Sequence, residues 1–181
     1  MSAGQYTVTL TVTDPSNATA SDTAAVTVNA PATEITAFSD GFEVSTWNGL
    51  WTNDGQNDWF RSTQRAASGG FSAEVDGLAS NAKLTSKAIN LQGRSNATIT
   101  FSWYIENSLD AGEYVAFDVQ TNGATTWVEK ARIRGNVDPE DAWQNVTVNL
   151  TGLTSPKMRF RAKMSGGEED ADVDAVKITV N

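Results

Sequence analysis

The sequence predicts an all-β protein: an antiparallel two-sheet β-sandwich that follows a separate β-hairpin. Thr, Val and aromatic residues alternate with the two-residue period of strands, in short runs. Gly, Asn, Asp and Ser, which favour turns, separate these runs. No convincing apolar stripe with the 3.6-residue helical period is present, so the crossover helices of a large parallel sheet are not expected. These observations together favour an antiparallel sandwich.

The hairpin is predicted in the first 30 residues. Residues 6–13 place Tyr6, Val8, Leu10 and Val12 on one face and Thr on the other. A turn is expected at residues 14–17, because Pro presets φ and Asn tolerates the left-handed region. Residues 24–28 are predicted as the return strand, and residues 31–37 as a linker. An isolated hairpin is marginally stable in water.

The remaining residues, 38–181, are predicted to form the sandwich. Roughly eight or nine strands in about 145 residues match a two-sheet sandwich or jelly roll. A hairpin turn is expected at Asn122 and Gly123. The predicted strands are residues 71–75, 97–106, 113–120, 127–134, 142–150, 157–164 and 172–180.

Composition removes several function classes. The 181 residues include 13 Lys and Arg and 22 Asp and Glu, giving a net charge of −9, with no Cys and no His. This excludes thiol nucleophiles, imidazole bases and zinc fingers. The negative charge argues against nucleic acid or an anionic membrane surface as a partner. No apolar run is long enough to insert into a membrane.

Two stretches of the chain resemble known extracellular modules. Residues 4–14 and 21–28 resemble the last two strands of a PKD domain, an immunoglobulin-like module whose earlier strands are missing here. This resemblance implies a partial domain over residues 1–30. Either it belongs to a longer protein, or a neighbouring chain completes it.

Residues 38–180 resemble β-sandwich modules related to MAM domains and carbohydrate-binding jelly rolls. The similar segments are residues 40–43, 68–72, 98–104, 122–127, 143–150 and 173–176. MAM domains carry Cys pairs that this chain lacks, so the resemblance implies a bacterial relative. Such modules are usually non-catalytic parts of secreted enzymes or adhesins.

The carboxylates at the two ends of the sandwich sequence predict a structural Ca²⁺ site. Asp172 and Asp174 share parity with the apolar residues of the last strand and are therefore expected to face the core. A core-facing carboxylate needs a partner or a cation. Asp40 and Glu43 supply two further hard oxygen ligands, and the resemblance implies that the first and last strands are neighbours. Alternatively, Asp174 accepts backbone amides and needs no metal.

Basic side chains concentrate on two predicted strands. Lys157, Arg159, Arg161 and Lys163 share one face, and Lys130, Arg132 and Arg134 share another. If both line one sheet surface, Arg132, Arg134, Arg159 and Arg161 become candidates for binding an acidic polysaccharide, because Arg binds carboxylate and sulfate bidentately. Alternatively, the face is solvated and neighbouring acids neutralise it.

Six tryptophans are candidates for stacking on sugars. Trp103, Trp59, Trp143 and Trp127 are expected in the core, because buried Trp is usual in a sandwich. Trp47 and Trp51 lie in the predicted loop of residues 45–51 and are the best exposed candidates. Tyr104, opposite the core face of its strand, is another.

These features predict a non-catalytic, extracellular carbohydrate-binding or adhesion module of a larger secreted or surface protein. The expected cofactor is structural calcium and the expected partner is a polysaccharide, with an acidic polysaccharide as one candidate. The alternative is a structural spacer or assembly module that self-associates through exposed strand edges. A hydrolase is least supported, since nothing in the sequence places two carboxylates across a cleft.

Overall fold

A computed structural model describes residues 2–30, 33–121 and 124–181 and confirms the all-β fold. The chain divides into two compact units, residues 1–33 and 34–181. The turn predicted at Asn122 and Gly123 lies outside the described residues. Each unit is described by itself below.

The first unit contains the predicted hairpin. Strands β1 (Gly4–Thr13) and β2 (Thr19–Val28) pair antiparallel over their whole length, so the return strand starts five residues earlier than expected. The carboxylate of Asp14 holds the turn by accepting the backbone amides of Ser16 and Ala18 at 2.8 and 2.9 Å. Val8, Leu10 and Val12 are 55–67% exposed. Both long strands therefore keep their apolar face open to solvent.

The second unit is a two-sheet sandwich. Its first strand begins at Ile35, three residues before the expected start of the sandwich. Most of the predicted strands are present within one or two residues. The strands are β3 (Ile35–Asp40), β4 (Trp51–Asn53), β5 (Trp59–Ser62), β6 (Ser72–Asp76), β7 (Ser80–Ser86), β8 (Ala97–Ile105), β9 (Tyr114–Gln120), β10 (Val128–Arg134), β11 (Gln144–Leu150), β12 (Lys157–Lys163) and β13 (Asp170–Val180), with one short 3-10 helix, η1 (Trp47–Gly49).

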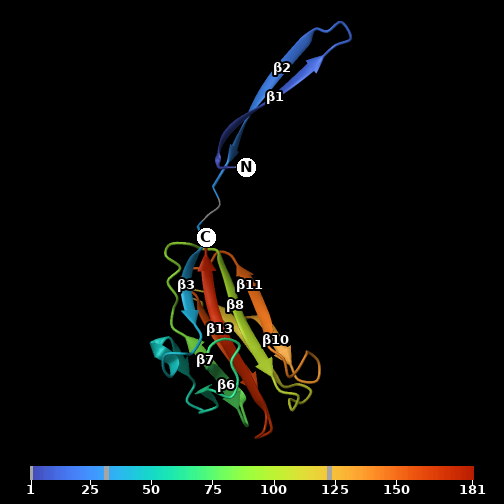
Figure 1. Cartoon of the computed structure of the whole chain (residues 1–181). Helices are drawn as coiled ribbons and strands as arrows, with labels where there is room; N and C mark the ends of the chain where they lie inside the picture. Colours follow the sequence, from blue (N-terminus) through green and yellow to red (C-terminus); the bar gives the residue numbers. More distant parts are fainter. Residues whose placement is uncertain (1, 31–32, 122–123) are drawn as a thin grey trace. The chain divides into compact units, whose positions relative to one another are not determined.

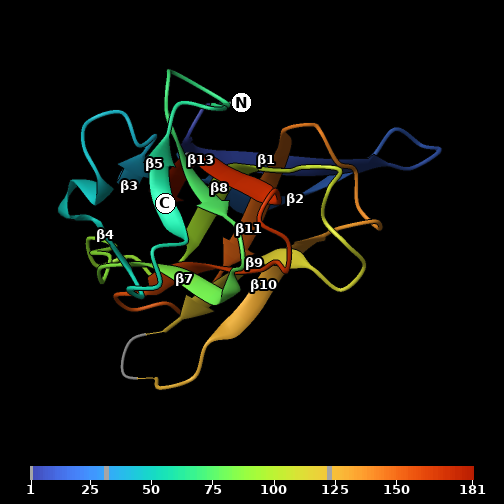
Figure 2. The same cartoon turned by 90° about the horizontal axis from the view of Figure 1, so that it is seen from below.

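The two sheets have five and six strands. The five-stranded sheet has the order β10-β9-β12-β7-β4, and the six-stranded sheet has the order β11-β8-β13-β6-β5 with β3 also paired to β13. Figure 1 shows β3, β13, β8 and β11 side by side, and Figure 2 shows β7, β9 and β10 in the opposite layer. The first and last strands of the sandwich are therefore neighbours, as the resemblance implied.

A β-bulge in β13 overturns the expected orientation of its two carboxylates. Asp174 pairs with Ser102 and Lys177 pairs with Thr100, so one residue more separates the two positions on β13 than on β8. Ala175 has φ 52° at this point. The extra residue shifts the alternation. Ala171 and Val173 face the core before the bulge and Val176 and Ile178 after it. Asp172 and Asp174 consequently lie on the outer face of the sheet, and both are nonetheless fully buried.

Aromatic side chains join the two sheets across the core. Phe101 of β8 lies 4.8 Å from Phe117 of β9 and 5.1 Å from Phe160 of β12, measured between ring centroids. All three are at most 2% exposed. Contacts of this kind add stabilisation beyond the area they bury. Trp59 and Trp103 are also buried, as predicted.

Replacing Phe117 with Ala should remove the centre of this aromatic contact and leave a cavity between the sheets. We expect the free energy of unfolding to fall by about 3–5 kcal/mol, measured by urea denaturation. Val137→Ala is the matched control, because Val137 is 61% exposed, and it should change stability by less than about 0.5 kcal/mol. Equal effects of the two changes would contradict this description of the core.

Candidate functional site

Basic side chains from two strands meet on the outer face of the five-stranded sheet. In β12, Phe160 points into the core, so Arg159 and Arg161 on either side of it point outward. Asp118 is the outward residue of neighbouring β9, and it pairs in register with Arg159 on β12 and with Glu129 on β10. The structure thus brings together residues that are separated by about 40 positions in the sequence.

A network of ion pairs fixes these side chains. Asp118, only 1% exposed, accepts hydrogen bonds from Nε of Arg159 at 2.6 Å and from Nε of Arg161 at 3.1 Å. Arg161 also bonds Glu129 at 2.8 Å and donates to the hydroxyl of Tyr114 at 2.6 Å. Glu129 in turn accepts from Arg132 at 2.6 Å. Arg132, Arg159 and Arg161 therefore belong to one continuous network.

The network favours the ionised forms of Arg161 and Glu129. Burial alone would lower the pKa of Arg161, but the hydrogen bond and the charge of Asp118 outweigh burial and raise it. The hydrogen bond from Arg132, followed by the charges of Arg132 and Arg161, lowers the pKa of Glu129 despite partial burial. At neutral pH the face consequently presents oriented guanidinium groups rather than mobile ones.

Two aromatic rings lie under these guanidinium groups. The guanidinium carbon of Arg159 lies 4.4 Å from the ring centroid of Trp127, and that of Arg132 lies 3.7 Å from the ring of Tyr114. Both distances are within the range of a cation–π contact. Flat apolar rings beside fixed N–H donors suit a ligand that has an apolar face and an edge of oxygen acceptors.

Trp127 lies on this outer face, although strand alternation predicted it in the core. It was expected in the core because it shares parity with Ala131 and Ile133. The register of β10 against β9 shifts between Glu129 and Ala131. This irregularity breaks the alternation, so Trp127 is half-buried and stacks against an outward Arg. A β-bulge leaves no clear mark in the sequence.

A shallow hollow of about 330 Å³ continues the same face toward β7 and β4. Lys83 and Thr85 of β7 pair in register with Arg161 and Arg159 of β12, so the hollow adjoins the network. Lys83 lies 3.9 Å from Asp54. The lining residues are Thr52, Asn53, Asp54, Lys83, Thr85, Ser86, Lys87 and Lys157.

Other predicted ligand residues are placed differently. Arg134 lies at the end of β10 and pairs with Asp138 at 3.0 Å. Trp51 is only 4% exposed, contrary to expectation, because it opens β4 on the core side and donates its indole N–H to Asp40 at 2.8 Å. Trp47 is half-buried against Phe42, with ring centroids 6.4 Å apart.

Tyr104 lies on the outer face of the six-stranded sheet. Its hydroxyl bonds the carboxylate of Asp141 at 3.2 Å, its ring lies 5.7 Å from that of Trp143, and Arg65 covers it at 4.7 Å. Trp143 was expected in the core, but it is half-buried in this contact with Tyr104 and is not part of the core. These neighbours cover part of the Tyr104 ring.

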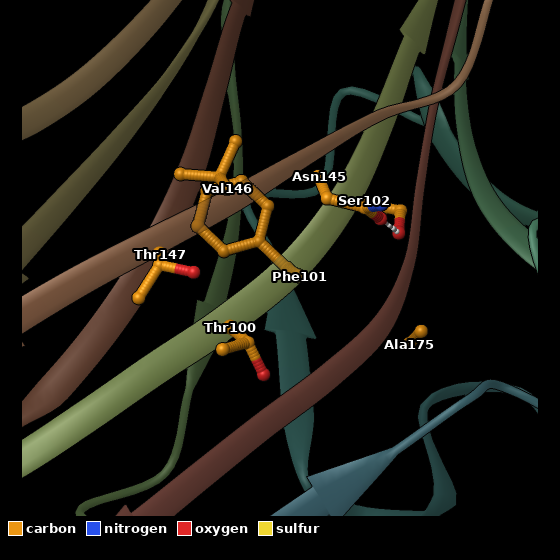
Figure 3. A pocket seen from close by; sticks show the side chains of 7 residues that line it. All are labelled: Thr100, Phe101, Ser102, Asn145, Val146, Thr147 and Ala175. Carbon is orange, nitrogen blue, oxygen red and sulfur yellow. Dashed lines mark hydrogen bonds between the residues drawn. The ribbon is translucent and has the colours of Figure 1, made fainter.

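A second hollow, of about 310 Å³, lies on that same outer face above the bulge of β13 (Figure 3). Ser102 donates to the side-chain oxygen of Asn145 at 2.8 Å there. The lining contains no charged side chain, and its one aromatic residue, Phe101, points into the core. This hollow offers fewer binding groups than the five-stranded face.

The four predicted metal ligands fall into two groups. Asp174 accepts the amides of Ala67 and Ser68 at 2.8 and 2.9 Å, and Glu43 accepts those of Gly70 and Phe71 at 3.0 Å. One loop between β5 and β6 therefore holds both carboxylates. Burial raises the pKa of Asp174, three backbone amides oppose this, and the charge of Glu43 raises it further, so the two carboxylates interact.

Asp40 and Asp172 are committed to other partners. Asp40 accepts the backbone amide of Phe42 at 3.0 Å in addition to the indole of Trp51. Asp172 accepts the hydroxyl of Ser72 at 2.7 Å and lies 3.4 Å from Arg65. Burial raises the pKa of Asp172 to about 7, although the bond from Ser72 opposes the rise.

Comparison with solved structures places this geometry among known sandwiches. The chain is similar to a carbohydrate-binding module, TmCBM61, in complex with β-1,4-galactotriose, with 13% identity and a TM-score of 0.60 over 78% of this chain and 94% of that one. It is similar to the xylan-binding domain CBM22-1 of Paenibacillus barcinonensis Xyn10C, with 15% identity and a TM-score of 0.58 over 83% and 97%.

A third similar structure is the K3 adhesin domain of Lys-gingipain from Porphyromonas gingivalis, with 17% identity and a TM-score of 0.60 over 82% of this chain and 100% of that one. These similarities show the fold of the chain: it contains a β-sandwich like the ones in these modules. No protein-family model and no curated protein matches the sequence. Across the residues that the structure describes, no helix is long and apolar enough to cross a membrane.

Asp118→Asn should loosen the ion-pair network while keeping the shape of the side chain. Arg159 and Arg161 would lose their shared charged acceptor, so we expect the free energy of unfolding to fall by about 2–3 kcal/mol. Urea denaturation measures the loss. Asp138→Asn, which breaks only the more exposed pair with Arg134, should cost less than about 1 kcal/mol. A smaller loss for Asp118→Asn than for this control would refute the organising role of Asp118.

Proposed function

We propose that the protein is a non-catalytic carbohydrate-binding module of a larger secreted or surface protein, and that it binds an acidic polysaccharide on the outer face of the five-stranded sheet. The observation that carries the proposal is the contact of Trp127 with Arg159, beside Arg161 and the buried Asp118. The known ligands of similar modules, galactotriose and xylan, support polysaccharide as the ligand class.

The chemistry of this face suits a sugar chain. A pyranose ring has an apolar C–H face that can pack on the indole of Trp127, while its hydroxyl groups accept from Arg and Lys donors. A uronate or sulfate group adds negative charge, which a guanidinium can bind bidentately. The basic residues Arg132, Arg159, Arg161, Lys83, Lys87 and Lys157 outnumber the acids Asp54, Asp118 and Glu129 on this face.

Trp127→Ala should weaken polysaccharide binding at least about tenfold, which equals about 1.4 kcal/mol of binding free energy. The change removes the stacking surface and one support of Arg159. Isothermal titration with oligogalacturonate, xylooligosaccharide and galactotriose measures the affinity, at two salt concentrations. Binding of the acidic ligand should fall as salt rises, because screening weakens the guanidinium contacts.

Trp143→Ala is the matched control, because Trp143 is also half-buried but lies next to Tyr104 on the other sheet. It should leave the affinity within about twofold. If Trp143→Ala or Trp47→Ala abolishes binding and Trp127→Ala does not, the site lies elsewhere. Salt-independent binding of only the neutral ligands would refute the acidic specificity.

We further propose that Glu43 and Asp174 bind a structural Ca²⁺. Both are hard carboxylate donors, the loop of residues 67–71 holds both, and their charges repel one another. A bound cation would remove this repulsion and tie the start of the sandwich to its last strand and to this loop. Asp172 is less suitable because Arg65 already supplies it with a positive charge, and Asp40 because the buried indole of Trp51 binds it. Glu43 and Asp174 have only neutral backbone amides as partners, as the metal-free alternative expected for Asp174.

Chelation should therefore destabilise the protein. Adding EDTA should lower the melting temperature by roughly 5–10 °C relative to a solution whose free Ca²⁺ is about 100 times its Kd, and Ca²⁺ should restore it. Scanning calorimetry measures the shift. The double variant Glu43→Gln, Asp174→Asn should lose most of the response, and an undiminished response would contradict the assignment.

A second candidate function is a spacer or assembly module. The observation that favours it is the exposed apolar face of the hairpin, on which Val8, Leu10 and Val12 are at least 55% exposed. Such a face can pack on another strand pair. This function predicts concentration-dependent self-association in sedimentation velocity, weakened by Leu10→Thr, together with no binding in the glycan titrations.

A further inference from the structure

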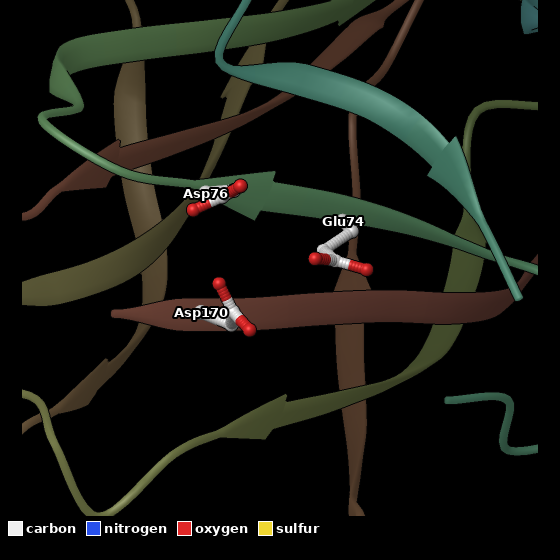
Figure 4. Close-up of side chains that lie close together, drawn as sticks. All are labelled: Glu74, Asp76 and Asp170. Carbon is white, nitrogen blue, oxygen red and sulfur yellow. The ribbon is translucent and has the colours of Figure 1, made fainter. Parts of the chain in front are cut away.

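Three carboxylates outside the sites described above converge where β6 ends and β13 begins. Asp76 of β6 pairs in register with Asp170 of β13, and Glu74 is two residues before Asp76 on the same face of β6. Figure 4 shows the three side chains gathered over the two strands. One oxygen from each lies within 4.8 Å of the others.

Glu74 is the carboxylate of this cluster that has a buried oxygen atom without a partner. It is only 2% exposed, and its Oε2 atom has no hydrogen-bond partner among the described residues. A buried carboxylate oxygen without a hydrogen-bond partner costs more free energy than an exposed one, because burial removes the charge from bulk water. In native structures a buried polar atom is rarely left without a hydrogen-bond partner or a bound ion.

The surrounding charge is strongly negative. Glu106, Asp170 and Asp172 share one guanidinium, that of Arg65, which lies 3.9 Å from Asp170 and 3.4 Å from Asp172. Neither Glu74 nor Asp76 has an ion pair within the described ranges. Burial raises the pKa of Glu74, a hydrogen bond from Ser62 opposes the rise, and the charges of Asp170 and Asp76 add to it. Burial and then the charge of Asp170 raise the pKa of Asp76. The protein itself therefore supplies too little positive charge for this cluster.

We propose that Glu74, Asp76 and Asp170 bind a divalent cation of the Ca²⁺ class, at a second site that shares no ligand with Glu43 and Asp174. Ca²⁺ binds oxygen ligands at 2.3–2.6 Å, so ligands on opposite sides of the ion lie about 5 Å apart, comparable with the spacing of these oxygens. The chain has no Cys or His, the ligands that softer metals prefer. Waters would complete the coordination shell. The ion would join the end of β6 to the start of β13.

Calcium titration of chelator-treated protein by isothermal calorimetry tests this site. Asp76→Asn keeps the size of a half-buried side chain and should weaken one class of Ca²⁺ sites at least about tenfold. Glu74→Gln should do the same, and it also supplies an amide in place of the unsatisfied oxygen, so it is expected to fold. Glu168→Gln is the control, because Glu168 acts on Asp76 by its charge but is not one of the three clustered ligands. It should change affinity less than about threefold.

The outcomes separate the two calcium proposals. The double variant Glu43→Gln, Asp174→Asn should retain the site that Asp76→Asn removes. The triple variant, which adds Asp76→Asn to this double variant, should bind no Ca²⁺. Equal binding by wild type, Asp76→Asn and Glu74→Gln would overturn the second site. An effect of Glu168→Gln as large as that of Asp76→Asn would also overturn it, since charge alone would then explain the affinity. Absence of any Ca²⁺ binding by the wild type would refute both sites.

Discussion

The two-residue alternation of strand side chains is the constraint on which this sandwich depends. The core takes one face of each strand, and Phe101, Phe117 and Phe160 show how tightly the two sheets close over it. Strand alternation decides which residues face the surface, and a β-bulge shifts that alternation by one residue. The bulge at Ala175 turns Asp172 and Asp174 outward, and the shift after Glu129 leaves Trp127 on the outer face. The outward positions of Trp127 and of the two aspartates follow from these two irregularities, whereas regular alternation places Arg159 and Arg161.

The outer faces of the two sheets differ sharply in charge. On the five-stranded sheet, one fully buried carboxylate, Asp118, orients Arg159 and Arg161. On the six-stranded sheet acidic groups outnumber basic ones, since the single guanidinium of Arg65 pairs with Glu106, Asp170 and Asp172. A protein with a net charge of −9 thus has a basic outer face on one sheet and an acidic outer face on the other. The net charge of the chain does not reveal this difference between the two faces.

Sequence reasoning predicted the long strands well, because β8, β9 and β12 alternate apolar and polar residues throughout. It missed β3, β4, β5 and β7, which are short or carry few apolar residues: β7 places only Ala82 and Leu84 in the core cluster. The gathering of basic residues was anticipated from strand parity. The burial of Trp51 was not, because its partner Asp40 comes from another strand. Trp127 was missed because a bulge is a property of strand register, which local alternation does not encode.

Binding of a sugar chain beside Trp127 is the central claim, and nuclear magnetic resonance of ¹⁵N-labelled protein tests it most directly. During titration with an acidic oligosaccharide, the indole N–H of Trp127 and the Nε–H signals of Arg159 and Arg161 should shift together and saturate. The indole signals of Trp47 and Trp143 should stay unchanged. Shifts confined to Trp47 or Trp143, with Trp127 and both Arg signals unmoved, would contradict the account.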